Sequence, residues 1–301
     1  MSSTQANTEK TAGSAKNAAR PGLLRWDVFV TPGIPIVTRD KPPGVRETFF
    51  QATASTLIYG ARDAVLVDAF MTVAQATALA DWVATHRKNL TTIYITHGHG
   101  DHWFGLGTLL DRFPNAKAVA TPNAVKEMHG NASPQALDAV WKAGFPGQIP
   151  DKLVFAEEMK GNVIDLEGQE LIAVELGHTD TDDTTCLHVP SIGLVVAGDA
   201  VYNDVHLYLA QSNPQTRREW IAALDKIESL KPRAVVASHK RPEKPDDPRT
   251  IEETRQYIRD FDRLAETTTT AQDLYDRMLE LYPNRVNPGW ALWSSARAVK
   301  P

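Results

Sequence analysis

The alternation of apolar and polar positions divides the chain into strand-like and helix-like segments. Short apolar runs rich in β-branched and aromatic residues predict strands, at 26–30, 34–37, 55–59, 64–67, 93–95, 116–120, 153–155, 171–175, 184–189, 194–197 and 233–237. Apolar positions at helical spacing predict helices, at 72–86, 104–112, 122–128, 134–142, 214–230, 251–266 and 271–281. A proline inside 34–37 marks that run as an edge strand, and 55–59 with 64–67 predicts a hairpin.

These elements fall into two strand-rich halves, each closed by helices. A loop-like stretch with glycine and proline, 144–150, separates the halves. Such an order predicts an α/β fold in which two sheets pack together and helices cover both outer faces. We expect 1–22 to be a disordered tail, because it is polar and lacks the apolar segment of a secretion signal. We expect 23–245 to form the main domain and 246–301 a helical extension packed on it.

Residues that can bind metal are concentrated directly after the run 93–95. His97, His99, Asp101 and His102 lie within six positions of one another. Because a strand leads into this turn, their side chains should lie at the carboxyl end of a sheet, where α/β folds place their sites. Imidazole and carboxylate groups are ligands of divalent transition metals. The pattern therefore predicts a metal site.

The string His97-Gly98-His99-Gly100-Asp101-His102 resembles the signature of the metallo-β-lactamase superfamily, and further motifs follow in the family's order. They end in Asp68, His178, Asp199 and His239, each after an apolar run. The resemblance extends over about 27–240. It implies a four-layer αββα sandwich, with 23–245 as the catalytic domain and extra helices at the C-terminus.

The resemblance also implies two divalent metal ions, with zinc the first choice and iron or manganese as alternatives. The first ion would be held by His97, His99 and His178, and the second by Asp101, His102 and His239. Asp199 would bridge the two ions. Asp68 would not touch metal but would orient the ligands, as outer carboxylates do.

A pair of ions of this kind activates a water molecule for attack on a carbonyl, and Asp101 could pass a proton to the leaving atom. Tyr202 follows Asp199 by three positions. This spacing resembles that of acyl-homoserine-lactone lactonases, in which a tyrosine hydrogen-bonds the substrate carbonyl; the alternative is a tyrosine packed under the loop. We therefore expect a hydrolase of small lactones or lactams.

Other interpretations stay open. The acidic string 180–183 departs from the lactonase pattern, and Asp182 or Asp183 could orient ligands or cap the next element. His206 is a candidate for contact with substrate. The alternatives to a lactonase or lactamase are a glyoxalase II-like thioester hydrolase, a persulfide dioxygenase with one iron, and a metal-binding sensor without catalysis. The C-terminal helices are too generic to predict a glutathione site.

Composition limits the partners. The 301 residues carry a net charge of −5 and include no basic arm, so we do not expect binding to nucleic acid. No apolar stretch approaches the about 20 residues that a membrane span needs. The single cysteine, Cys186, excludes an internal disulfide and favours a reducing compartment, so we expect the cytoplasm. The expected partner is a small-molecule substrate, and apolar stripes on the C-terminal helices leave a homodimer open.

Overall fold

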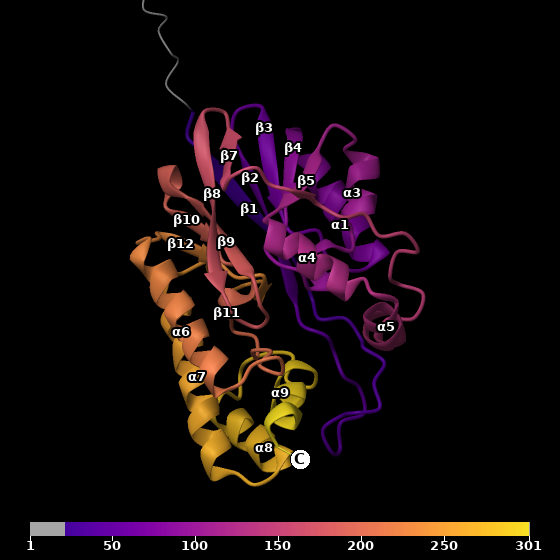
Figure 1. The fold of residues 1–301 in the computed structure, drawn as a ribbon, viewed down its shortest axis with the longest axis vertical. Helices are drawn as coiled ribbons and strands as arrows, with labels where there is room; N and C mark the ends of the chain where they lie inside the picture. Colours follow the sequence, from indigo (N-terminus) through magenta and orange to yellow (C-terminus); the bar gives the residue numbers. More distant parts are fainter. Residues whose placement is uncertain (1–21, 301) are drawn as a thin grey trace, which may run out of the picture.

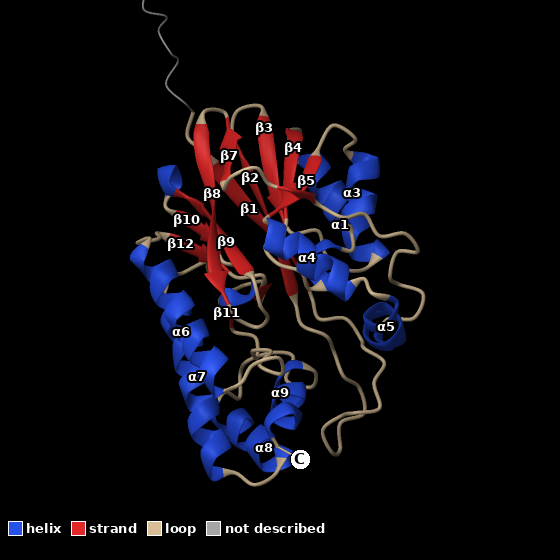
Figure 2. Ribbon diagram, in the orientation of Figure 1, coloured by secondary structure: helices blue, strands red, loops and turns tan. Residues whose placement is uncertain are grey.

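Two mixed β-sheets pack face to face in the computed structural model, which describes residues 22–300, and helices cover both outer faces (Figures 1 and 2). This is the predicted α/β, four-layer αββα sandwich with additional C-terminal helices. The tail expected over 1–22 lies, apart from Gly22, outside the described residues.

The first sheet has six strands in the order β1-β2-β3-β4-β5-β6. They are β1 (Arg25–Thr31), β2 (Thr53–Tyr59), β3 (Asp63–Val67), β4 (Asn89–Tyr94), β5 (Lys117–Ala120) and β6 (Glu157–Glu158). The first three strands pair antiparallel, as the predicted hairpin requires, and β3 to β6 pair parallel. The parallel part carries the carboxyl ends at which the sequence predicts the site.

Five helices follow the strands of this half, and all but the last, α5, bury apolar side chains. They are α1 (Val73–Thr85), α2 (Gly100–Trp103), α3 (Leu106–Arg112), α4 (Pro122–Asn131) and α5 (Pro134–Ala136). Thr72 begins α1 with a capping box, in which its hydroxyl accepts from the backbone of Gln75. Leu79 and Val83 of α1 are buried in the same apolar cluster as Leu66 and Ile93 of the sheet.

The second sheet has five strands in the order β12-β10-β9-β8-β7. They are β7 (Val163–Leu166), β8 (Gln169–Gly177), β9 (Thr184–Val189), β10 (Leu194–Val196) and β12 (Ala234–Val236). Its outer face is covered by α6 (Pro214–Ser229), on which α7 (Arg249–Thr267) packs, while α8 (Ala271–Leu281) and α9 (Ala291–Val299) lie below the lower end of the sheet in Figure 1. These helices share one apolar cluster with α6, which contains Trp220, Ile258 and Leu292.

Apolar side chains from both sheets fill the space between them. Val65 and Val67 of β3 pack in one cluster with Leu187 and Val189 of β9. Because β3 is covered on both faces, all but its first residue are buried, which is the usual state of a central parallel strand. The two halves of the chain are therefore joined by a continuous core.

A short third sheet links the second half to the site. It pairs β11 (Tyr202–Asn203) with β13 (His239–Lys240) in parallel and places Tyr202 opposite His239. Short 3₁₀ segments, η2 (Pro190–Ile192) and η3 (Gly198–Ala200), lie before and after β10. Within residues 22–300, no helix has the length and apolar character that crossing a membrane requires.

Three predicted elements were wrong in position or type. The run 34–37 forms only one bridge, Pro35 to Phe49, because 32–52 leaves the sheet as an extended strap. The run 153–155 forms no strand, and β6 follows it instead. The predicted helix 134–142 is interrupted: α5 leads into a π-helix, η1 (Leu137–Lys142), a type of distortion that is frequent at functional sites.

Candidate metal centre

The turn after β4 and the short helix that follows it carry four candidate ligands close together. Two residues of this segment must be glycine: a Cβ on Gly98 would lie 2.4 Å from the Cβ of Glu127, and one on Gly100 would lie 2.4 Å from the ring of Phe104. This close packing brings the turn against α4 and starts α2, the one-turn helix that carries Asp101 and His102. The two glycines therefore allow a tight turn that holds the imidazoles of His97 and His99 close together.

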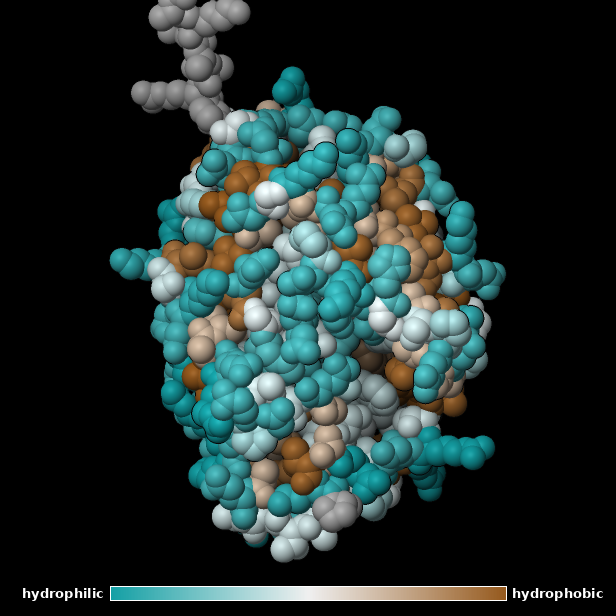
Figure 3. Space-filling view, viewed as in Figure 1, coloured by the Kyte–Doolittle hydropathy of each residue, from teal (hydrophilic) through white to brown (hydrophobic). Residues whose placement is uncertain are grey.

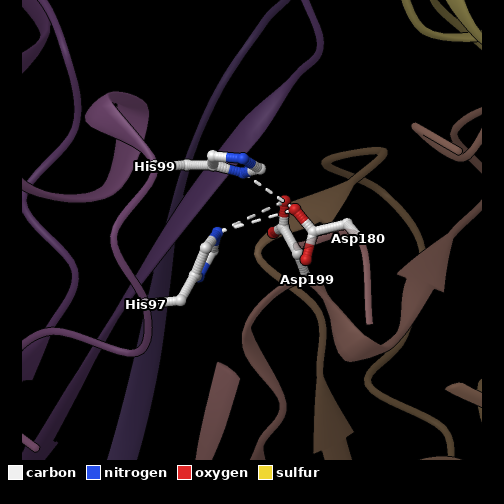
Figure 4. Close-up of side chains that lie close together, drawn as sticks. All are labelled: His97, His99, Asp180 and Asp199. Atoms are coloured by element: carbon white, nitrogen blue, oxygen red, sulfur yellow. Dashed lines mark ion pairs between the residues drawn. The ribbon is translucent and has the colours of Figure 1, made fainter. Parts of the chain in front are cut away.

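Four buried side chains form what we call group one: His97, His99, Asp180 and Asp199 (Figure 4). One ligand atom from each lies within 4.8 Å of the others. Asp180 Oδ2 lies 2.8 Å from His99 Nδ1 and 3.7 Å from His97 Nε2. Asp199 Oδ2 lies 3.9 Å from His97 Nε2. Imidazoles from the first half of the chain thus face carboxylates from the second half.

Group two consists of Asp101, His102 and His239, with ligand atoms again within 4.8 Å of one another. Asp101 Oδ2 lies 3.2 Å from His102 Nε2 and 3.4 Å from His239 Nε2. Asp199 reaches this group as well: its Oδ1 lies 3.5 Å from His102 Nε2 and its Oδ2 lies 3.0 Å from His239 Nε2. Asp199 is therefore the carboxylate that lies between the two groups.

His178 lies outside both groups, unlike the arrangement expected from the sequence. Its Nδ1 lies 2.6 Å from Asp182 Oδ1, and Asp180 faces His97 and His99 instead. The backbone explains the exchange, because β8 has a bulge before Gly177 and Gly177 has a φ of +83°. Asp180 thus lies beside His97 and His99, and His178 Nε2 is buried without a hydrogen-bond partner among the described residues.

Sequence reasoning thus missed Asp180, although it singled out the acidic string in which Asp180 lies. The Thr179 hydroxyl donates to Asp180 Oδ1 at 2.9 Å, which leaves Oδ2 directed at the histidines. Asp182 is exposed and contacts His178, while Asp183 accepts from Asn123 at 3.2 Å. The contact of Asp182 with His178 is the kind expected of a residue that orients a ligand, whereas Asp183 contacts only Asn123 among the hydrogen bonds of the described residues.

Contacts on the far side of each ring fix the orientation of the histidines. Asp68 Oδ2 lies 3.0 Å from His102 Nδ1 and accepts from the Ser238 hydroxyl at 3.0 Å. Asp68 Oδ1 accepts from the Thr96 amide at 2.9 Å. His239 Nδ1 lies 3.0 Å from the Ala52 carbonyl. Each outer contact leaves Nε2 free to point inward, which is the arrangement that metal-binding histidines need.

The carboxylates and imidazoles strongly shift one another's protonation. Burial opposes charge on His99, but Asp180, Asp101 and Asp199 together raise its pKa to about 9. Burial and the neighbouring His102 lower the pKa of His97 to about 4. Burial also opposes charge on Asp199, yet His239 and His102 hold its pKa well below the usual value. The centre therefore keeps its carboxylates ionised, as metal binding requires.

Several polar atoms of the centre are buried and have no hydrogen-bond partner among the described residues: His97 Nε2, His102 Nε2, Asp101 Oδ2, Asp180 Oδ2 and Asp199 Oδ1. Unpaired buried polar atoms are rare, because each one costs free energy. Each of these five is a potential ligand atom of group one or group two, and His178 Nε2 is a further buried imidazole nitrogen without a partner among the described residues. The donor set of imidazoles and carboxylates fits divalent metal ions.

Two further residues singled out by the sequence lie close to the centre but not on its open side. Tyr202 is fully buried, and its hydroxyl donates to Asp199 Oδ2 at 3.3 Å. His206 is also fully buried, with Nδ1 2.9 Å from the Tyr257 hydroxyl. Neither residue lines the pocket that opens onto the centre, whereas Tyr208 does.

A pocket of about 310 Å³ opens onto both groups. Its floor includes His99, Asp101, Asp180, Asp199 and His239. Its walls come from the strap 32–52, the segment from α4 to η1, the loop after β11 and Trp290. A volume near 300 Å³ is at the lower end for small-molecule sites, so the pocket suits a small ligand.

A curated relative matches a short part of the chain. It is a hydroxyacylglutathione hydrolase from Francisella tularensis subsp. novicida (strain U112), which is 36% identical over 64 residues. The match covers 21% of this chain and 24% of the relative, so the chain spans about a quarter of the length of the curated relatives it matches. The similarity is therefore local.

Solved structures match over much more of the chain. A metallo-β-lactamase family protein from Thermus thermophilus has a TM-score of 0.61 and 19% identity, covering 90% of this chain and 91% of that one. A metallo-β-lactamase from Pontibacter korlensis has a TM-score of 0.54 and 16% identity, covering 77% and 99%. At this identity the likeness shows the fold. The family profile described as metallo-β-lactamase superfamily matches residues 49–239, and the chain belongs to that superfamily.

Proposed function

We propose that the protein is a hydrolase that uses two divalent metal ions to open a small cyclic ester or amide. The observation that carries this proposal is the shared carboxylate: Asp199 lies between group one and group two, and both groups open onto one pocket. A shared carboxylate keeps two ions at the short separation that two-metal hydrolysis uses.

His97, His99, Asp180 and Asp199 would hold one ion, and Asp101, His102 and His239, with Asp199, the other. We propose zinc, because imidazole and carboxylate without thiolate suit it, and iron or manganese as alternatives. Such ions supply an activated water and polarise a carbonyl when bound. His178, the third histidine expected from the family, stays a proposed ligand of the first ion, since its Nε2 is buried without a hydrogen-bond partner among the described residues.

The chain's own side chains would then position and transfer protons. Asp101 lines the pocket and its Oδ2 has no hydrogen-bond partner among the described residues, so it can carry a proton to the leaving atom. Tyr202 donates to Asp199 and would hold that carboxylate in place. Asp68 would hold His102 in the same manner. His206 does not line the pocket, so it would affect the substrate only indirectly, through the residues that it contacts.

Hydrolysis of a thioester is the second candidate, and the local similarity to a hydroxyacylglutathione hydrolase favours it. The attack on a thioester carbonyl would need the same two groups. A persulfide dioxygenase would instead need one iron and would consume oxygen. A metal-binding sensor would bind ions without turnover.

A hydrolysis screen of the zinc-, manganese- and iron-loaded protein tests the proposal. The panel contains lactones, lactams, thioesters and a persulfide, and oxygen uptake is recorded in parallel. We expect turnover of a lactone or lactam that chelators abolish and that Asp199→Ala lacks. Preference for a thioester would favour the second candidate. Oxygen uptake with one iron per chain, or metal binding without any turnover, would overturn the proposal.

We also make proposals about the domain organisation, the location in the cell and the oligomeric state. We propose that 23–245 forms the catalytic domain and that 246–301 is an extension of it, since α7, α8 and α9 share the apolar cluster of α6. We propose a cytoplasmic location, because the single cysteine, Cys186, is free and buried. A homodimer is a proposal that gel filtration can test.

A further inference from the structure

The walls of the pocket are apolar and largely aromatic. Phe50, Trp141 and Phe145 are buried, and Trp290 completes the ring of aromatic side chains. Aliphatic surface is added by Ile36, Ala136 and Val140. In Figure 3, brown, hydrophobic surface borders a hollow between the region of α5 and that of α9, which is the region from which these walls come.

Phe50 lies at the centre of this wall and joins it to the metal centre. Its ring centroid lies 5.5 Å from that of Phe145, 6.4 Å from that of Trp141 and 6.1 Å from that of Trp290. It lies 6.3 Å from the ring of His239, a member of group two. The apolar wall therefore begins directly beside the proposed ligands.

The strap that carries Phe50 is held in place. The Ile36 amide donates to the Thr48 carbonyl within the strap, and the Val37 amide donates to the carbonyl of Gly144, which follows η1, both at 2.9 Å. The Trp293 indole donates to Asp40 Oδ1 at 2.8 Å. The wall is thus a fixed part of the fold, and its shape and polarity should select among ligands.

The charged side chains that line the pocket are acidic residues and histidines. None of the described lining residues is lysine or arginine, and the charged ones are Asp101, Asp180 and Asp199 together with the histidines of the centre. Two neutral polar groups are already used: Gln51 donates to the His206 carbonyl at 2.7 Å, and Gln211 Oε1 lies 3.4 Å from His99 Nε2. An anionic group on a substrate would find no cation on the described walls, away from the ions.

We propose that the substrate carries an uncharged, apolar or aromatic substituent on the ring that is opened, and that substrates with an anionic group on that substituent are rejected. This inference rests on the proposed function and sets its substrate class. It separates the pocket from one built for a glutathione conjugate, whose carboxylates need cationic partners. It equally separates it from one built for a lactam that carries a carboxylate.

A pair of lactones tests the inference: γ-nonalactone and the same lactone with a carboxylate at the end of its side chain. For the metal-loaded protein we expect kcat/KM to favour the neutral lactone by more than about tenfold, because the walls bury alkyl groups and offer the carboxylate no partner. Equal values, or a preference for the anionic lactone, would overturn the inference. Cleavage of both at equal rates would leave the proposed function standing.

A charge added at the pocket mouth provides the matched comparison. Val140 lines the pocket and is 46% exposed, so Val140→Lys should fold and place a cation beside the substrate. Val163 of β7 is 44% exposed and lies outside the pocket lining, so Val163→Lys is the control. We expect Val140→Lys to narrow the neutral-to-anionic ratio by about fivefold or more, and Val163→Lys to leave it unchanged. An unchanged ratio in both variants would count against the inference.

Binding gives a readout without turnover. The metal-free protein is titrated with each lactone, and the fluorescence of its tryptophans, which include Trp141 and Trp290, reports binding. We expect the neutral lactone to bind more tightly, and Trp141→Phe to reduce the signal. If no lactone is hydrolysed but this preference holds, the proposed function fails and the inference stands. If the anionic lactone binds as tightly, the inference fails.

Discussion

Group one and group two differ in how firmly the fold holds them. In group two, the outer nitrogen of each histidine has a fixed contact: Asp68 for His102 and the Ala52 carbonyl for His239. In group one, His97 Nδ1 lies 3.0 Å from the buried Thr96 hydroxyl, but Asp180 comes from the irregular turn after β8, and His99 contacts the exposed Gln211 on its outer side. Group two is therefore anchored in the core, while group one lies partly on a loop.

This contrast suggests a division of roles. The anchored group should bind its metal tightly and keep the geometry constant, because its outer contacts preorganise the ligands. The loop-based group should bind more weakly and be the place at which the structure departs from the family pattern. Asp199 contacts both groups, so it should matter to both.

The largest effect is expected for Asp199→Ala, which removes the carboxylate shared by both groups. Metal content should fall and kcat should drop by at least about 100-fold, the lower end of losses when a group that stabilises the transition state is removed. Asp111→Ala, on the exposed side of α3, is the control and should match the wild type. If Asp199→Ala kept full activity, the proposal that Asp199 bridges the two groups would be wrong.

The next largest effect distinguishes the two candidates for group one. Asp180→Ala should weaken binding of the first ion by about tenfold or more, because it deletes a buried carboxylate 2.8 Å from His99 Nδ1. His178→Ala should change affinity less, since His178 contacts Asp182. Isothermal titration with zinc measures both. A greater loss in His178→Ala would restore the family's ligand and reject Asp180.

Asp68→Asn probes the anchored group. The substitution keeps the shape of the side chain but weakens its contacts to His102 and Ser238. Affinity at group two should fall by about 10–100-fold, as for other outer contacts of metal ligands. Chelator competition gives the dissociation constants, with Asp111→Asn as the control. Loss confined to group one would contradict the assignment of Asp68 to group two.

The change of Tm with pH should have opposite signs in the metal-free and the metal-loaded protein. In the metal-free protein the folded-state pKa of His99 is raised to about 9, above the unfolded value of 6.5. Its contribution is then fully present below pH 6.5 and is lost as the pH rises through 9, so Tm should fall by a few degrees across this range. With metal, the imidazole ligands are neutral and Tm should rise instead. Parallel curves with and without metal would contradict this.

The smallest effect is expected for Tyr202→Phe. The variant loses one hydrogen bond, the 3.3 Å contact to Asp199 Oδ2, and nothing in the pocket lining. We expect kcat to fall by less than about tenfold, with KM unchanged, as for loss of one weak bond to a charged group. Steady-state kinetics with the lactone measures both constants. A fall of about a thousandfold, the size of a lost oxyanion contact, would place the hydroxyl on the substrate instead.

The sequence predicted the two-sheet fold well because each core strand is a short apolar run between polar turns. It also named six of the seven side chains that the structure brings together in the two groups, because their motifs follow strands in order. It missed Asp180, which lies in the irregular turn that follows the bulge before Gly177 and the positive φ of Gly177. One sequence does not predict where the backbone of such a turn bends.

The pocket wall was the second gap. Phe50 belongs to the core and also lines the pocket. Trp141 and Phe145 were not singled out, because they lie on a predicted helix and a predicted loop, and their meeting depends on the strap 32–52 and the π-helix η1. Such long-range contacts have no signature in local periodicity.

Metal analysis of the wild-type protein tests the central claim most directly. The protein is dialysed against zinc, freed of excess ion, and analysed by inductively coupled plasma mass spectrometry beside Asp180→Ala and Asp199→Ala. Because two separate groups of buried ligands share Asp199, the account predicts two ions per wild-type chain, about one for Asp180→Ala and fewer for Asp199→Ala. A wild-type chain that binds one ion or none would contradict the two-metal centre.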